Sequence, residues 1–361
     1  MTYFSNSYER AREKFLRASV AADAVIQTTD LEGDLVVDVA LLGEPGKPTL
    51  IVTSGLHGVE GFFGSAVQLS LLEQLQQSGC LGELRVVLVH GLNPFGFKHI
   101  RRFDQSNIDL NRNFLRPDES YSGAPPGYKQ LNSFLNPGFS PSVFEPYRLK
   151  ALLKIMRYGI PALKEAIVSG QYEYPDGIFF GGQESAVSTE FVKAHCEGWV
   201  NGSDKVAHID LHSGLGNFGS YELLINETPE SADYPWYVKT FDQKFISTLQ
   251  SSDSIAYPVT GSMGAWLKHR FSDRKYYFAG LEFGTYGPIR VLGAIRAENC
   301  AHHYAEVGSR SYAAAKAELL ECFCPRSESW RRAVIDQSMN IISSAIEELC
   351  SGQGGKNNES G

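Results

Sequence analysis

The chain lacks the features that mark membrane, secreted or nucleic-acid-binding proteins. It contains no run of about 18 apolar residues, which argues against a transmembrane helix. Its first residues hold no apolar segment of the kind found in signal peptides, so we expect a cytoplasmic protein. No run of Lys or Arg is longer than a pair, and the net charge is −8. We therefore expect neither a nucleic acid nor a membrane as a partner.

Cysteine is also scarce, with six residues in a chain of 361. The cysteines are scattered, and Cys322 and Cys324 form the only close pair, with no further Cys or His cluster beside it. This usage predicts free thiols in a reducing compartment rather than disulfides or a zinc site. No repeat with a period of about 20–50 residues is visible, which excludes solenoids and propellers.

The composition that remains is that of an ordinary globular protein with a sizeable core. Apolar residues make up 43% of the chain and charged residues 20%. No stretch has the composition of a linker, so we expect residues 1–350 to form one domain. We expect a Pro- and Gly-rich excursion over the surface near 115–143, and a disordered tail at 351–361.

Short apolar or β-branched runs alternate with helical patterns along the chain. Two strands are expected around the turn residues Gly33-Asp34 and Gly43–Pro48, and further strands at 49–53, 84–90, 206–211, 221–225 and 276–283. The expected helices are 8–22, a segment ending near 77, 145–169, 297–321 and 327–350. This order predicts an α/β fold with a mixed or largely parallel sheet and helices on its faces.

Three side chains that commonly bind metals follow two of these strands. His57 and Glu60 lie on a Gly-containing turn after the strand 49–53, and His212 lies where the strand 206–211 meets a Gly-rich loop. Each could be an ordinary surface or buried residue if taken singly. Two His and one Glu with a fourth position open are, however, the ligand set of a catalytic zinc site, whereas a structural site would close all four positions. Asp210 is a candidate partner for one of these histidines, although its orientation cannot be fixed from the sequence.

Charged and amide side chains suited to substrate binding and proton transfer complete the pattern. Glu282 ends an apolar strand, where a carboxylate is costly unless it is paired or used. In a zinc hydrolase it would be the general base that accepts a proton from the activated water. Asn111 and Arg112 could clamp a substrate carboxylate, because Arg presents a bidentate fork. An arginine of the preceding pair, Arg101-Arg102, could stabilise an oxyanion.

The order of these motifs resembles that of the zinc carboxypeptidase superfamily, typified by carboxypeptidase A. The shared pieces are His-x-x-Glu at 57–60, Asn-Pro-x-Gly at 93–96, Arg101-Arg102, Asp-Leu-Asn-Arg-Asn-Phe at 109–114, His212 and Glu282. The similarity spans about residues 49–290, and the stretch 170–182 is similar to a bacterial branch rather than to the digestive enzymes. Aspartoacylase and succinylglutamate desuccinylase share the architecture. The resemblance implies a mixed, mostly parallel twisted sheet with helices on both faces.

The resemblance also implies a role for each matching residue. His57, Glu60 and His212 would hold one zinc ion per chain, and Glu282 would be the general base. Arg102 or Arg101 would stabilise the oxyanion, and Asn111 and Arg112 would bind the substrate carboxylate. Tyr257, which lies 25 residues before Glu282, is the nearest candidate for the tyrosine that contacts the substrate terminus in the superfamily.

Three functions remain open from the sequence. The first is a zinc carboxypeptidase acting on small peptides, and the second is a deacylase of N-acylated amino acids in the manner of aspartoacylase. The third is a binding module without catalytic activity, although such relatives usually lose a ligand or the base, and this chain keeps every position. Zinc content and hydrolysis of a substrate panel would separate the third function from the first two.

Overall fold

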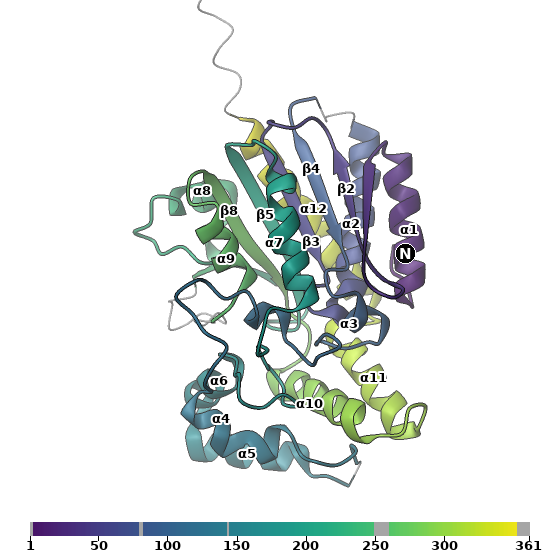
Figure 1. The fold of residues 1–361 in the computed structure, drawn as a ribbon, viewed down its shortest axis with the longest axis vertical. Helices are drawn as coiled ribbons and strands as arrows, with labels where there is room; N and C mark the ends of the chain where they lie inside the picture. Colours follow the sequence, from purple (N-terminus) through teal and green to yellow (C-terminus); the bar gives the residue numbers. More distant parts are fainter. Residues whose placement is uncertain (1–2, 79–81, 143, 249–259, 352–361) are drawn as a thin grey trace, which may run out of the picture.

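The computed structural model describes residues 3–78, 82–142, 144–248 and 260–351. Within these residues the strands form one eight-stranded sheet in the order β1-β2-β4-β3-β5-β8-β6-β7 (Figure 1). The strands are β1 (Val25–Glu32), β2 (Leu35–Leu42), β3 (Thr49–Ser54), β4 (Arg85–His90), β5 (Lys205–Ser213), β6 (Tyr221–Ile225), β7 (Ile246–Thr248) and β8 (Lys275–Phe283). The four central strands β4, β3, β5 and β8 are parallel to one another, whereas β1–β2, β2–β4 and β6–β8 are antiparallel pairs. The predicted mixed, mostly parallel sheet is confirmed.

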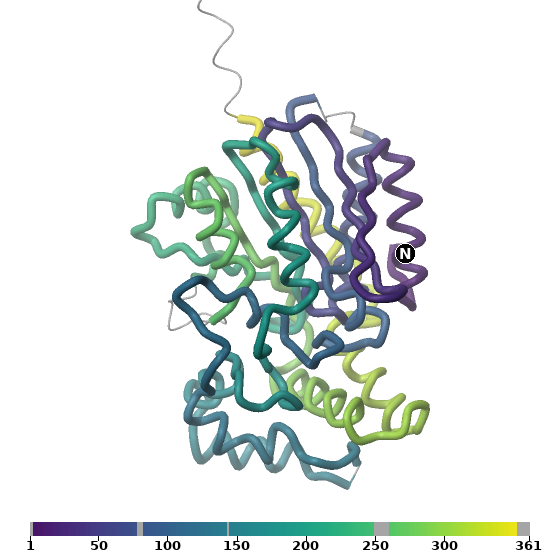
Figure 2. The backbone as a smooth tube through the Cα atoms, viewed as in Figure 1, coloured from purple at the N-terminus to yellow at the C-terminus, as the bar shows by residue number. Residues whose placement is uncertain are grey.

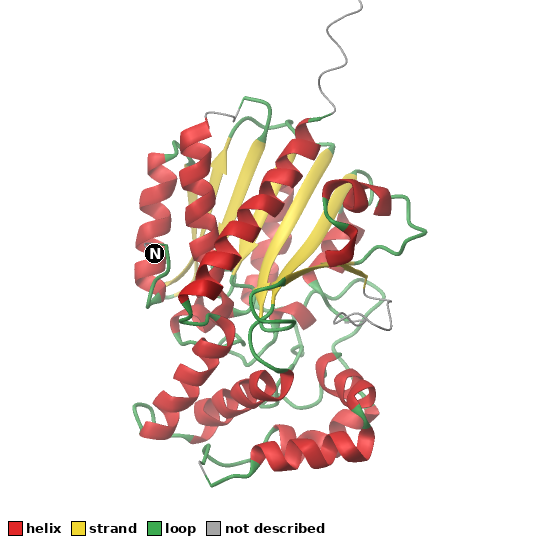
Figure 3. Ribbon diagram, turned by 180° about the vertical axis from the view of Figure 1, so that it is seen from behind, coloured by secondary structure: helices red, strands yellow, loops and turns green. Residues whose placement is uncertain are grey.

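Helices cover both faces of this sheet, as expected for buried parallel strands. The helices are α1 (Tyr8–Ala21), α2 (Gly61–Ser78), α3 (Pro94–Lys98), α4 (Pro126–Leu135), α5 (Tyr147–Tyr158), α6 (Ile160–Val168), α7 (Val187–Val200), α8 (Tyr234–Thr240), α9 (Met263–Arg270), α10 (Pro288–Tyr304), α11 (Arg310–Phe323) and α12 (Glu328–Cys350). Helices α1, α2 and α12 pack on one face, which is in front in Figure 3, and α7 and α9 pack on the other. None of the helices in the described part of the chain is long and apolar enough to span a bilayer.

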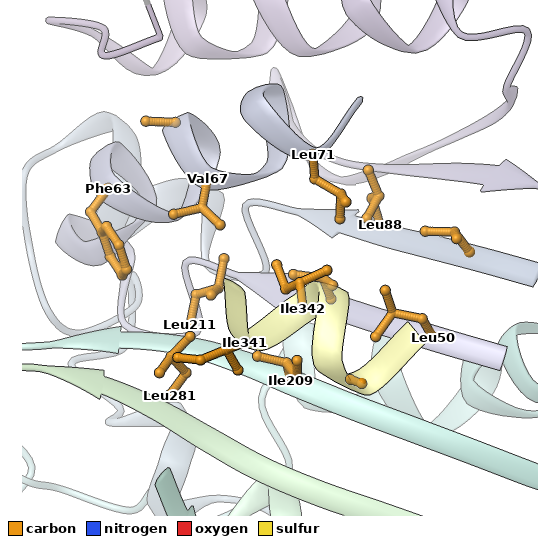
Figure 4. Packing of buried hydrophobic residues seen from close by; sticks show 14 of the residues in the cluster. Leu50, Phe63, Val67, Leu71, Leu88, Ile209, Leu211, Leu281, Ile341 and Ile342 are labelled. Carbon is orange, nitrogen blue, oxygen red and sulfur yellow. The ribbon is translucent and has the colours of Figure 1, made fainter. Parts of the chain in front are cut away.

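The core between α2, α12 and the sheet consists of aliphatic and aromatic side chains. Figure 4 shows Ile341 and Ile342 of α12 packing against Ile209 and Leu211 of β5, with Leu71 of α2 nearby. All five side chains are at most 5% exposed. Because this packing is extensive, the sheet is a stable frame from which loops can present polar side chains.

A third layer of helices lies beyond the ends of the central strands. Figure 2 shows that the chain returns to this end of the molecule twice, first with α4–α6 and later with α10 and α11. These helices share a core with Val59 and Phe103, which belong to the loops after β3 and β4. The excursion predicted near 115–143 contains α4 and is part of this layer. Residues 352–361 of the predicted tail lie outside the described residues.

The predicted helix at 297–321 is wrong, because the segment contains the end of one helix and the start of another. Helix α10 begins at Pro288 and ends at Tyr304, and α11 begins at Arg310. Between them Gly308 has a φ of +85°, and the side chain of Ser309 accepts a hydrogen bond from the backbone N–H of Tyr312. Gly in this conformation and Ser at the N-cap are ordinary signals of a helix boundary.

Candidate active site

Three buried side chains that could bind a metal ion meet at the ends of two neighbouring parallel strands. His57 follows β3, Glu60 lies in the 3-10 turn Gly58–Glu60, and His212 lies in β5. Nδ1 of His57 is 3.0 Å from one carboxylate oxygen of Glu60, and Nδ1 of His212 is 2.9 Å from the other. The three side chains are at most 5% exposed. They form the one group of His, Cys, Asp or Glu side chains in the described residues that could hold a metal ion.

A carboxylate holds the remaining ring nitrogen of each histidine. Nε2 of His57 lies 3.2 Å from Asp109, and Nε2 of His212 lies 2.6 Å from Asp210. In the metal-free protein Nδ1 of each histidine donates to Glu60. With a metal ion bound, a proton on Nε2 would leave the lone pair of Nδ1 directed at the ion, which is how a neutral histidine binds zinc. The structure thus places Asp210 where the sequence could not, and it adds Asp109, for which the sequence analysis named no role. The signal for Asp109 was its place as the first residue of the Asp-Leu-Asn-Arg-Asn-Phe motif.

The charges around Glu60 fit a bound cation. Burial on its own would raise the pKa of this carboxyl, but the charge of His57 and hydrogen bonds from both histidines lower the pKa to about 2. Glu60 therefore presents an ionised carboxylate. Two imidazoles and one carboxylate match the ligands of a catalytic zinc ion. The described residues fit zinc in both chemistry and placement.

The Asn-Pro-x-Gly motif holds the turn that carries His57 and Glu60. A Cβ on Gly58 would lie 2.1 Å from the backbone carbon of Gly96, so the two chain segments touch through their glycines. Asn93 fixes the second segment, because its side chain accepts from Gly96 N–H and donates to the carbonyl oxygen of Arg102. The motif thus supports the turn that carries His57 and Glu60.

The structure separates the two arginines that the sequence left as alternatives. Arg102 lines the central cavity and donates to Asp109 at 2.9 Å, and its Nη1 lies 3.6 Å from Glu60. Arg101 is fully buried and pairs with Glu298 at 2.9 Å, away from the residues that line the cavity. Arg102 is therefore the arginine that can reach a substrate oxygen in this cavity.

Asn111 and Arg112 also line the cavity. Arg112 is only 2% exposed, and its guanidinium donates to the carbonyl oxygens of Val168 at the end of α6 and of Asn111. The side-chain oxygen of Asn111 accepts from the backbone N–H of Met263. These contacts fix the orientation of both side chains. Binding of a carboxylate by this pair stays a prediction.

Glu282 lies opposite His212 in the register of β8 and β5. One of its carboxylate oxygens accepts a hydrogen bond of 2.9 Å from the backbone N–H of Leu215. Burial and the nearby charge of Glu60 raise the pKa of Glu282 to about 7. A carboxyl with this pKa can both accept and donate a proton near neutral pH.

These side chains surround one cavity of about 140 Å³. Its polar wall contains His57, Glu60, His212, Glu282, Arg102, Asn111 and Arg112. Val291 and Ile295 of α10 and Phe323 of α11 form part of the opposite, apolar wall. The cavity therefore lies between the ends of the central strands and the third helical layer. Tyr257, the remaining predicted substrate contact, lies outside the described residues.

Comparison with known proteins gives a family for the chain. A family model described as "Protein of unknown function (DUF2817)" matches residues 4–337. The chain belongs to the DUF2817 family. No curated protein matches the sequence.

Solved structures show the fold of this DUF2817 member. Carboxypeptidase A from Helicoverpa armigera is similar with a TM-score of 0.52 at 10% identity, over 96% of this chain and 74% of that one. Bovine thrombin-activatable fibrinolysis inhibitor, solved in complex with tick carboxypeptidase inhibitor, has a TM-score of 0.50 at 12% identity, over 96% of both chains. At these identities the likeness establishes the fold, which is carboxypeptidase-like as the sequence predicted.

A chain of buried hydrogen bonds extends from His212 of this DUF2817 protein into the sheet. Asp210 accepts from the hydroxyl of Thr53 at 2.6 Å, and Thr53 in turn lies 3.0 Å from Nε2 of His208. Nδ1 of His208 lies 2.7 Å from the hydroxyl of Tyr276. Burial lowers the pKa of His208 to about 4, so this ring is neutral. One arrangement of protons satisfies every member: Tyr276 donates to His208, His208 to Thr53, and Thr53 to Asp210.

Proposed function

We propose that this protein is a zinc-dependent hydrolase that cleaves an amide bond next to a free carboxylate, as a metallocarboxypeptidase does. The observation that carries the proposal is the single cavity shared by the His57–Glu60–His212 group, Glu282 and two arginines. Each charged group has a distinct role in amide hydrolysis, which makes a binding module without activity the less economical explanation.

The chain's own residues would divide the work of hydrolysis. Zinc, when bound, would supply a Lewis acid and make a water molecule more acidic. Glu282 would accept a proton from the attacking water and return it to the leaving nitrogen, in keeping with its raised pKa. Arg112, with Asn111 beside it, would hold the substrate carboxylate in a buried charge-assisted pair.

Arg102 would stabilise the negative oxygen that develops on the scissile carbonyl. Its Nη2 lies 2.7 Å from Nε2 of His57, a contact that requires this nitrogen to lack its proton. In the tautomer that binds metal through Nδ1, Nε2 carries the proton and donates to Asp109. A substrate oxygen in the cavity, which Arg102 lines beside Glu60, would lie within reach of this guanidinium.

Deacylation of an N-acyl amino acid is the second candidate function. The small size of the cavity supports this function as well. A volume of about 140 Å³, closed on one side by α10 and α11, suits a short substrate rather than an extended peptide. A dipeptide and a short N-acyl amino acid both present an amide and a free carboxylate. The two candidates therefore share the same proposed clamp.

The clamp is tested with matched substrates in the zinc-loaded protein. Dipeptides and N-acyl amino acids are each supplied as the free acid and as the amide, and kcat/KM is measured for both. We expect the acid to be preferred by about 10²-fold or more, because only the acid brings a negative charge to the buried guanidinium. Arg112→Ala should lose most of this preference and Arg112→Lys should recover part of it. Equal rates on acid and amide in the wild type would refute the clamp and with it both candidates.

Two substitutions separate metal binding from proton transfer. Glu282→Gln should keep the zinc and lower kcat by roughly 10²–10⁴-fold, which is the usual contribution of a general base. His212→Ala should lose the zinc, measured by elemental analysis, while its circular dichroism spectrum stays that of the folded protein. A Glu282→Gln variant with normal zinc content and near-normal turnover would give Glu282 a structural role.

A further inference from the structure

Helix α5 exposes a stripe of large apolar side chains at the edge of the third helical layer. Leu149, Leu152, Leu153 and Met156 recur at the spacing of one helix face, and Ile160 continues the stripe at the start of α6. Their exposed fractions range from 49% to 74%. Figures 1 and 3 show α5 at the outer edge of the molecule, on the side away from the sheet. A contiguous apolar stripe of this kind marks a contact surface.

The opposite face of α5 is firmly attached to the protein. The ring of Tyr147 stacks on Phe134 of α4, with centroids 5.6 Å apart, and its hydroxyl donates to the carbonyl oxygen of Ile289. Ala151, on the same side of the helix, is buried. The apolar stripe is therefore held outward by the packing beneath it.

Basic side chains flank the stripe on both sides. At 100° per residue, Arg148 lies on one side of the four apolar positions of α5, and Lys150 and Arg157 lie on the other. All three are exposed. The segment 145–165 contains five Lys or Arg residues and two Glu, so its net charge is 5 − 2 = +3, although the whole chain has a net charge of −8. An apolar stripe between rows of cations on a firmly held helix is the pattern of a protein that rests on an anionic lipid surface.

We propose that α5 docks this protein on the surface of a membrane rich in anionic lipids. The apolar side chains would enter the interface, and the flanking cations would contact the lipid phosphates. With 12 residues, α5 would be about 18 Å long, which is too short to cross a bilayer, so the contact is peripheral. The sequence expectation of no membrane partner rested on the absence of a spanning segment and on the acidic net charge of the whole chain. Helix α5 does not span a bilayer, and its cations are concentrated locally.

The charges disfavour the other simple occupant, which is a second copy of this chain. Two copies joined through α5 would bring Arg148 and Arg157 against the same cations, and the nearby Glu145 already pairs with Lys150 and Arg296. An acidic bilayer supplies the missing negative charge. The inference does not depend on the proposed hydrolase activity.

The test measures binding of the full chain to vesicles. Sedimentation with vesicles of phosphatidylglycerol and phosphatidylcholine is compared with vesicles of phosphatidylcholine alone. We expect binding to the anionic vesicles, and we expect it to weaken as salt is raised, because salt screens the attraction. Leu152→Asp/Met156→Asp should bind about tenfold or more weakly, since two apolar contacts are replaced by charges of the wrong sign. Arg148→Gln/Arg157→Gln should lose most of the preference for anionic over neutral vesicles.

The matched control carries the same two changes at equally exposed apolar positions outside the stripe, Val20→Asp/Val307→Asp, and it should bind as the wild type does. Thermal unfolding of each variant reports whether the fold is kept. Absence of wild-type binding, equal binding to neutral vesicles, or equal binding by the two Asp variants would overturn the proposal. A dimer in sedimentation equilibrium that Leu152→Asp/Met156→Asp dissociates would also overturn it, because a second copy would then cover the stripe.

Discussion

At the scale of single residues, the orientation of His212 depends on side chains that never touch the cavity. Asp210 lines the cavity and accepts from His212, but Asp210 is itself oriented by Thr53, and Thr53 by His208. Partners of this kind commonly change metal affinity about 10–100-fold when they are removed. The hydrogen-bonded chain therefore makes Thr53 a positioning residue for the metal.

Replacing Thr53 tests this role. Thr53→Val removes the hydroxyl and leaves one carboxylate oxygen of Asp210 and the His208 N–H without this partner, although Asp210 keeps its contact with His212. We expect zinc to bind about 10–100-fold more weakly in chelator competition. Thr49→Val is the matched control, because Thr49 is equally buried in the same strand but donates to the carbonyl oxygen of Lys47. Equal zinc affinities in the two variants would show that the chain does not position the metal.

The residues proposed to act directly were identified from the sequence, but those that orient them were not. His57, Glu60, His212 and Glu282 each carry reactive groups next to a strand end, where function is expected. The supporting role of Asp109 depends on a contact with His57 across 52 positions, which spacing alone does not reveal. The choice between Arg101 and Arg102 likewise depends on Glu298, a buried partner in a distant helix.

At the scale of elements, the strand at 221–225 was predicted with its observed bounds, because an apolar or β-branched run between turn residues is a local signal for a strand. The order in which strands pair has no such local cause, since β8 is inserted between β5 and β6 by packing of the whole sheet. The boundary at Gly308 had a local signal that the Ala-rich composition on both sides obscured. The local sequence thus determines where helices and strands form, whereas packing between distant segments determines which strands pair.

The close contact between the turn at 58–60 and helix α3 gives a prediction for two elements together. Gly58→Ala places a Cβ against the backbone of Gly96, so the turn must move and carry Glu60 with it. We expect weaker zinc binding and a loss of about 1–3 kcal/mol in the free energy of unfolding, the usual cost of overpacking. Gly198→Ala is the control, because nothing lies within 4 Å of its Cβ position in α7. Unchanged zinc affinity in Gly58→Ala would show that the turn adapts without moving its ligand.

At the scale of the whole molecule, the site lies where two packed bodies meet. The sheet supplies His57, His212 and Glu282, whereas the third helical layer supplies Val291 and Ile295 across the cavity. Closing this junction excludes water, and it also buries a carboxyl group close to another carboxylate. Folding of the metal-free protein therefore depends on whether Glu282 is ionised.

The pH dependence of stability tests this link. The pKa of Glu282 is raised from 4.5 to about 7 in the folded protein, so the contribution of the protonated group is complete below about pH 4.5 and is lost as the pH rises through about 7. The loss of stability corresponds to about 3 kcal/mol.

The variant Glu282→Gln cannot ionise, so it should not show this loss of stability. With metal removed by a chelator, the free energy of unfolding of the wild type should thus fall between about pH 4.5 and pH 7, compared with that of Glu282→Gln. Glu60, with its pKa lowered to about 2, changes stability mainly below about pH 5, and it is present in both proteins, so it does not produce the difference between them. Exposed Glu306→Gln should follow the wild type. Parallel curves for the wild type and Glu282→Gln would mean that burial does not hold the proton on Glu282.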